Sequence, residues 1–195
     1  MNKTELRFTA PLELREAEGE QDTVRVEGYA AVYNERANIA GIFEEILAPG
    51  ALDGRLGDDV KFLVNHRDLP LARTTSGTLQ LSLDARGLKI SAVLDRTDPD
   101  VARIVPKIKR GDMSKMSYAF EVDSETWDES GDMPLRTINK VRRLHDVALV
   151  TDPAYQGTEI ALRSLEAHRG AEAPGADSAA DLARAGFKSR LAALI

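Results

Sequence analysis

Ser117 lies where a strand could present a nucleophile. Residues 111–120 read GDMSKMSYAF, and the second half of this segment alternates large and small side chains. Because alternate residues of a strand face opposite sides, Met116, Tyr118 and Phe120 would anchor one face in a core while the serine's face keeps open space. A hydroxyl there could attack a substrate if a base lay within hydrogen-bond reach. The alternative is an ordinary serine on the solvated face of a half-buried strand.

The chain has three histidines, and His66 is the best placed to act as that base. It ends an apolar alternation of Val60, Phe62 and Val64, just where the chain enters a polar segment. This rim position would leave the imidazole partly desolvated yet reachable, as a general base requires. His168 lies in a C-terminal segment of different composition and is a poor candidate for a rigid site. The alternative for His66 is a strand-end histidine that bonds a backbone group.

A carboxylate to orient the base is expected in the last strong strand pattern of the chain. His145 and Asp146 are neighbours there, so strict alternation points them to opposite faces and only one can face the site. Asp146 falls in the apolar row of Leu144 and Ala148, where a carboxylate is costly to bury without a partner such as an imidazole N–H. We therefore favour Asp146 and keep His145 as the runner-up. The alternative for Asp146 is a salt bridge to an adjacent arginine.

Two competing assignments use nearby residues. His66, Asp68, His145 and Asp146 are all metal-ligand types, but they lack the His-x-x-x-His spacing of helical zinc sites. We therefore predict neither a metal nor a cofactor. Ser114 precedes the expected strand, so we expect it to form a turn rather than to act as the nucleophile. Oxyanion-hole donors stay unassigned, because backbone N–H groups leave no mark in a sequence.

Composition excludes several other classes of protein. With 195 residues and 43% hydrophobic content the chain can form a core, and the absence of cysteine removes disulfides, thiolate metal sites and a cysteine nucleophile. The net charge of -6 provides no positive field for a nucleic acid. No segment approaches the roughly 20 apolar residues of a membrane span, and the N-terminus lacks a signal-peptide pattern. We expect a soluble protein of a reducing cytoplasm that binds neither nucleic acid nor membrane.

Short strand patterns dominate the first part of the chain. They occur at residues 24–33, 42–47, 60–66, 78–83, 88–94, 115–122 and 141–150. The strands at 78–83 and 88–94 predict a hairpin whose loop needs Gly87. A helix is expected from a cap at Asp98 to Gly111, kinked or divided at Pro106, and a shorter helix at 49–56. These elements indicate an α+β fold that is mainly β, a small closed or partly open β-barrel packed by a few helices.

A change of composition near residue 166 predicts a domain boundary. Residues 166–195 are rich in alanine and contain the helix breakers Gly170, Pro174 and Gly175. We assign residues 1–165 to one domain and residues 166–195 to a flexible tail, in which a short amphipathic helix begins near Asp177. A disordered terminus is the alternative.

Six short motifs along the chain can be compared, in order, with those of a known protein family. They are Glu27–Tyr33 (EGYAAVY), Ile46–Leu52 (ILAPGAL), Val64–Arg67 (VNHR), Arg86–Leu88 (RGL), Gly111–Phe120 and Leu144–Tyr155 (LHDVALVTDPAY). In this order they resemble the prohead, or capsid maturation, proteases of tailed bacteriophages, which are similar in fold to the herpesvirus assemblins. The second motif departs from the family pattern, because Leu52 stands where the family has phenylalanine.

The resemblance implies a serine endopeptidase with His66 as general base and Ser117 as nucleophile. It places Asp146 where family members carry an acidic residue, often glutamate. Because aspartate is one methylene shorter, it must reach His66 from a closer strand. Assemblins use a second histidine as the third member, so His145 stays an alternative.

The resemblance also implies a substrate and a place of action. The substrate would be the major capsid protein, cut at its scaffolding segment inside the procapsid in the host cytoplasm, together with the protease itself. The tail would target the protease to the scaffold or be removed by self-cleavage, and the assemblin analogy allows a homodimer. The alternative function is a catalytically inactive β-barrel that serves as a scaffold or capsid component. The sequence does not reveal the cleavage-site preference.

Overall fold

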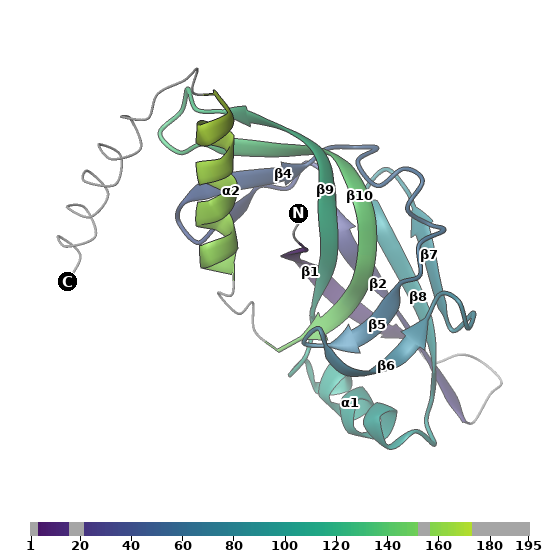
Figure 1. Ribbon diagram of the computed structural model, residues 1–195. Helices are drawn as coiled ribbons and strands as arrows, with labels where there is room; N and C mark the ends of the chain where they lie inside the picture. The colour runs from purple at the N-terminus through teal and green to yellow at the C-terminus, as the bar shows by residue number, and fades with distance from the viewer. Residues whose placement is uncertain (1–3, 16–21, 152–156, 173–195) are drawn as a thin grey trace, which may run out of the picture. The chain divides into compact units, whose positions relative to one another are not determined.

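The computed structural model describes residues 4–15, 22–151 and 157–172. It is mainly β with two helices (Figure 1), which confirms the mainly β, α+β class. The strands are β1 (Glu5–Arg15), β2 (Thr23–Val32), β3 (Ala37–Ile39), β4 (Phe43–Leu47), β5 (Lys61–Val64), β6 (Arg67–Arg73), β7 (Leu79–Leu83), β8 (Gly87–Asp95), β9 (Lys115–Asp128) and β10 (Leu135–Val150). The helices are α1 (Pro99–Arg110) and α2 (Gly157–Glu172). Within these ranges no helix has both the length and the apolar character needed to cross a membrane.

β10 organises the sheet. Hydrogen-bonded strands follow the order β3-β4-β10-β9-β1-β2-β8-β7, and β5 joins β10 to β6. One side of β10 pairs antiparallel with β9, and the other pairs parallel first with β4 and then with β5. The strands curve around a shared interior (Figure 1). Among the described residues no hydrogen-bonded pairing joins β7 to β3 or to β6, so closure into a barrel stays a prediction.

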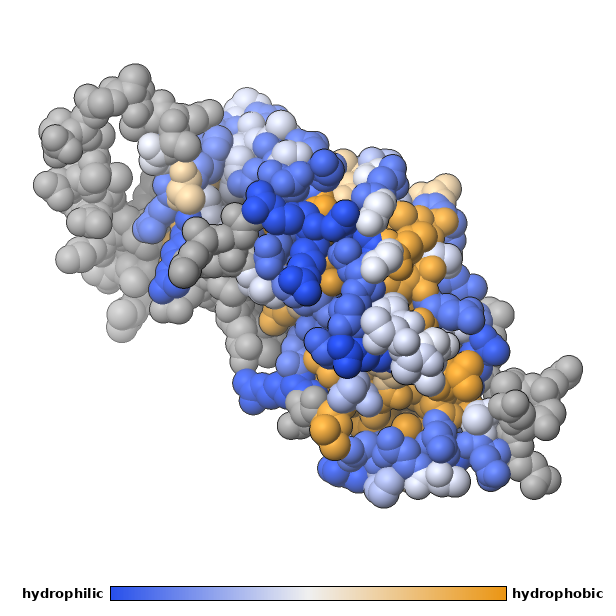
Figure 2. Space-filling view, turned by 45° about the vertical axis from the view of Figure 1, so that its right-hand side comes forward, coloured by the Kyte–Doolittle hydropathy of each residue, from blue (hydrophilic) through white to orange (hydrophobic). Residues whose placement is uncertain are grey.

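The interior is mainly apolar, as the alternation of the strands predicts. Its large members without accessible surface include Phe43, Phe62, Phe120, Leu144 and Leu149. On the face shown in Figure 2, hydrophilic side chains surround smaller hydrophobic patches. In the part of the chain that the structure describes, the exposed large hydrophobic side chains are Leu56 and Leu69, which is 75% exposed. Burial of these apolar side chains is the main favourable contribution to the stability of the fold.

α1 begins and ends where the sequence predicts. The Asp98 carboxylate accepts the N–H of Asp100, and Gly111 ends the helix in the left-handed conformation. The expected division at Pro106 is absent, because the helix is continuous from Pro99 to Arg110. Its two caps and its buried apolar face compensate for the one hydrogen bond that a proline removes.

The prediction of a short helix at residues 49–56 is wrong. Gly50 and Gly54 have φ values of 82° and 79°, which interrupt any right-handed helix, and the segment forms successive turns instead. Its backbone follows β10: Ala48 N–H donates to Ile138, and Val141 N–H donates to Ala51. We call residues 48–60 the β10 loop, because it occupies the edge of β10 between β4 and β5.

The hairpin of β7 and β8 is confirmed. Its loop requires glycine at position 87. Gly87 has φ of 152°, and a Cβ atom there would lie 2.1 Å from the Ala31 carbonyl oxygen of the neighbouring strand. Since that obstacle is backbone, Gly87→Ala is expected to lower the free energy of unfolding by about 2 kcal/mol. Urea unfolding measures this loss.

Gly77→Ala is the matched control for this prediction. Gly77 also has a positive φ, 75°, but a Cβ atom there meets nothing within 4 Å. Its loss should be limited to the left-handed backbone cost of about 1 kcal/mol. Equal losses in the two variants would show that the contact with Ala31 is unimportant.

The chain divides into two compact units, residues 1–161 and residues 162–195. α2 runs from Gly157 to Glu172 and therefore includes the position where we predict a domain boundary. The amphipathic helix predicted from Asp177 lies outside the described residues. The flexible tail of residues 166–195 stays a prediction.

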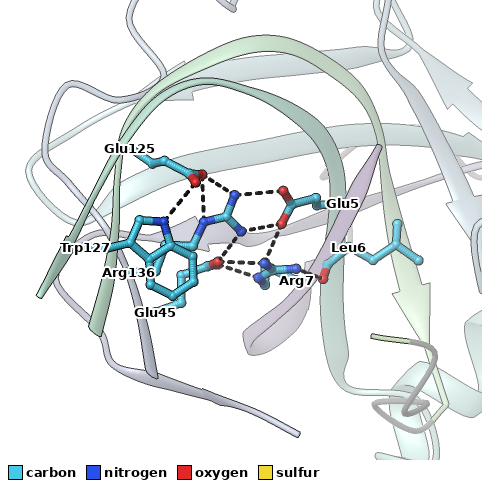
Figure 3. Close-up of polar contacts among 7 residues, drawn as sticks. All are labelled: Glu5, Leu6, Arg7, Glu45, Glu125, Trp127 and Arg136. Carbon is cyan, nitrogen blue, oxygen red and sulfur yellow. Dashed lines mark hydrogen bonds and ion pairs between the residues drawn. The ribbon is translucent and has the colours of Figure 1, made fainter. Parts of the chain in front are cut away.

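Five charged side chains form a largely buried cluster (Figure 3). They come from β1, β4, β9 and β10 and are Glu5, Arg7, Glu45, Glu125 and Arg136. Arg136 binds both oxygens of Glu5, at 2.6 and 2.8 Å, and also bonds Glu45 and Glu125. Arg7 joins Glu5 and Glu45 at 2.6 Å each. The cluster thus links four strands through ion pairs that are largely out of contact with water.

Two side chains, Glu5 in the cluster and Tyr118 near it, have shifted pKa values. Burial alone would raise the pKa of Glu5, but hydrogen bonding to Arg136 and the charges of both arginines outweigh burial and hold that pKa below its ordinary value of 4.5. Tyr118 follows Ser117 on β9. Its pKa is raised well above the ordinary value, mainly by burial and to a smaller extent by the negative charge of Glu45. Tyr118 is therefore a neutral part of the core.

Candidate active site

Ser117 lies in the middle of the sheet. On β9 it pairs with Ala148 of β10 on one side and with Phe8 of β1 on the other. Met116, Tyr118 and Phe120 belong to the main core cluster, whereas Ala119, although buried, does not, so the large side chains share one face as predicted. The serine itself has no exposed surface. The expectation that the serine's face keeps open space is therefore wrong, because other side chains cover the hydroxyl.

His66 occupies a turn rather than the end of a strand. β5 stops at Val64, which pairs with Arg67 of β6, so Asn65 and His66 form a two-residue connection. Their φ values are 50° and 57°, as the favoured two-residue hairpin turns require. The expectation that His66 shares the face of Phe62 is wrong, because alternation stops where the strand turns.

Asn65 ties this turn to the end of β10. Its N–H donates to the Leu149 carbonyl at 2.9 Å, and its Oδ1 accepts the Thr151 N–H at 3.2 Å. Asparagine also tolerates a positive φ better than most residues. Neither role of Asn65 is predicted from the sequence, although an asparagine at a strand end is a signal for a turn. The position of His66 is thereby fixed relative to β10.

Asp146 reaches the same place because β10 contains a β-bulge. Leu144 pairs with Phe120 and Asp146 with Ala119, so two residues of β10 advance for one residue of β9, and His145 is the extra residue. Leu144 is consequently in the core, while His145 and Asp146 are both half-buried. The expectations that Asp146 shares a face with Leu144 and that neighbouring residues must face opposite sides are both wrong at this bulge.

The three side chains meet in one hydrogen-bonded chain. His66 Nδ1 lies 2.6 Å from Asp146 Oδ1, and His66 Nε2 lies 2.6 Å from Ser117 Oγ. Because a carboxylate only accepts, Nδ1 carries the proton, and the neutral imidazole then accepts the serine O–H at Nε2. The side chains of His66 and Asp146 are 12% and 16% exposed. This arrangement can activate a hydroxyl for attack on a carbonyl and return the proton afterwards.

The other candidates take no part in this hydrogen-bonded chain. His145 Nε2 is 2.8 Å from Glu121 Oε1 and so has its own carboxylate partner. Ser114 precedes β9. His168 lies in α2, which belongs largely to the second unit of the chain. Of the residues considered from the sequence, the ones that the structure brings together are Ser117, His66 and Asp146.

Comparison with known proteins gives one finding. The model of the caudovirus prohead serine protease family matches residues 10–171, which is well over half of the chain and includes all three side chains. No curated protein and no solved structure matches the chain.

Proposed function

The chain belongs to the caudovirus prohead serine protease family, and from this premise we propose that it is a serine endopeptidase in which Ser117, His66 and Asp146 are the catalytic residues. The observation that carries the proposal is the pair of 2.6 Å contacts through which His66 joins the hydroxyl to the carboxylate. Two strands and the turn between β5 and β6, all far apart in the sequence, supply these groups. Such a convergence is what nucleophilic hydrolysis requires.

The proposed reaction follows the geometry of the site. His66 Nε2 accepts the proton of Ser117 as the hydroxyl attacks a peptide carbonyl, and the imidazolium then protonates the leaving amine. Asp146 keeps the proton on Nδ1 and stabilises the imidazolium. Water repeats the cycle on the acyl-enzyme. Because Ser117 has no exposed surface, the substrate must first displace the side chains that cover it.

The proposed substrate is the major capsid protein at its scaffolding segment, and the protease acts on its own chain as well. The family fixes the setting, which is capsid maturation within the procapsid in the host cell.

The test is to assemble procapsids from uncut capsid protein in the presence of this chain, so that the protein is enclosed as the shell forms. The wild-type chain is expected to remove the scaffolding segment, and mass spectrometry of the products identifies the bonds that are cut. Capsid protein that stays intact, with this chain bound at a copy number close to that of the shell, would favour the inactive scaffold component instead. A zinc chelator should leave cleavage unchanged, because the proposed reaction uses no metal.

A further inference from the structure

The bulge at His145 determines which way Asp146 faces. If His145 were paired regularly and the bulge were absent, β10 would keep strict alternation from Leu144, and Asp146 would fall on the core face with it. The side chain that contacts His66 is therefore correctly directed only while the bulge stays at this position. A bulge disrupts the ladder locally, so the backbone groups beside it need partners from outside the strand pair.

The β10 loop supplies that partner through Asp58. The Leu144 N–H, one residue before the bulge, donates to Asp58 Oδ2 at 2.8 Å. The Asp58 side chain is only 17% exposed, and Arg55 contacts its other oxygen at 3.4 Å. Arg55 also donates to the Arg142 carbonyl, so two residues of the loop bind the backbone of β10 next to the bulge.

We infer that Asp58 is a positioning residue: by holding the Leu144 N–H it keeps the bulge at His145 and so keeps Asp146 within hydrogen-bond distance of His66. The inference rests on the proposed function for its kinetic consequence, but its structural content does not depend on activity. Asp58 touches neither Ser117 nor His66 in any contact that the structure records, so its effect must pass through the backbone of β10.

Asp58→Ala tests the inference by kinetics. Loss of the acceptor lets Asp146 move relative to His66, and misplacement of a catalytic group by about 1 Å costs roughly 10²-fold in rate. We expect kcat to fall by about this factor while KM changes little, because the substrate contacts are untouched. Asp58→Asn keeps an acceptor oxygen of the same length and is expected to restore most of kcat.

Asp59→Ala is the matched control. Asp59 is the next residue and is also a partnered carboxylate, but it pairs with Arg73, at 2.5 and 2.7 Å, and makes no bond to β10. Its variant should keep the wild-type kcat. If Asp58→Ala does not yield folded protein, Asp58→Ser provides the same test, because its hydroxyl is too short to reach the Leu144 N–H.

A second measurement separates positioning from general stability and from the proposed function. The Nδ1 proton of His66, held by Asp146, should give a far-downfield signal in the proton NMR spectrum of the full chain. That signal is expected to disappear in Asp58→Ala and to persist in Asp58→Asn and Asp59→Ala. If the signal behaves so but the wild type cleaves nothing, the proposed function fails and the positioning role stands. A wild-type kcat, or an unchanged signal, in folded Asp58→Ala would overturn the inference.

Discussion

Ser117→Ala is expected to reduce peptide-bond cleavage by about 10⁴-fold or more, because it removes the atom that would form the acyl-enzyme. The side chain has no exposed surface, and alanine fits the same space, so the fold should be retained. The measurement is kcat/KM on a peptide that spans a bond cut in the capsid protein. Binding should be retained as well, so the loss is expected in kcat.

Ser114→Ala is the control for this experiment. Ser114 lies three residues earlier, before β9 begins, and takes no part in the hydrogen-bonded chain through His66. Its variant is expected to keep full activity and to react with a serine-directed phosphonate, whereas Ser117→Ala should not be labelled. Activity that survives Ser117→Ala but is lost in Ser114→Ala would transfer the nucleophile to Ser114.

The sequence predicts regular elements of this fold well and its irregular ones poorly. The hairpin around Gly87 and the caps of α1 follow from local chemistry, and the structure has them where expected. The helix expected at 49–56 fails because its turns depend on contacts with β10, which no local pattern records. β1 was not predicted at all, although it pairs with both β2 and β9. Long-range pairing, rather than propensity, determines these two segments.

The candidate site shows the same division. Residue type, place in the strand pattern and the family resemblance make Ser117, His66 and Asp146 the candidates, and the structure joins these three side chains. The reasons given for two of them do not hold, since His66 lies in a turn and Asp146 follows a bulge. Alternation is a property of regular strands, and functional residues often occupy the places where strands turn or bulge. Their directions follow from partners such as Asp58 and Asn65, whose roles depend on the folded backbone.

Arg136→Met is expected to have the largest effect on stability of any single change in the buried charge cluster. The Arg136 side chain is 2% exposed and contacts Glu5, Glu45 and Glu125. Methionine fills much of its volume, but it leaves Glu5 and Glu45 to share the single cation Arg7 and removes the ion pair of Glu125. Removal of one partner from a buried ion pair typically costs about 3–5 kcal/mol, and we expect a loss of this size in urea unfolding at neutral pH.

The control is Arg73→Met, which breaks the ion pair with Asp59 where the two side chains are 42% and 37% exposed. Exposed pairs contribute about 1 kcal/mol or less, so this variant should stay close to the wild type. A loss as large as that of Arg136→Met would mean that burial is not what makes the cluster important.

The pH dependence identifies the cause of the Arg136→Met defect. The pKa of Glu5 lies below its ordinary 4.5 in the folded wild type, so its pairing contributes stability above pH 4.5 and loses that contribution as the pH falls through the folded value. The variant lacks Arg136, the leading cause of this lowering, so a fall in pH destabilises it less, and protonation of a carboxylate relieves the excess of negative charge over the remaining cation Arg7. The difference in unfolding free energy between wild type and variant should therefore be largest near neutral pH and shrink below pH 4.5. If the difference in unfolding free energy stayed constant through this pH range, the defect would come from lost packing rather than from the loss of the cation.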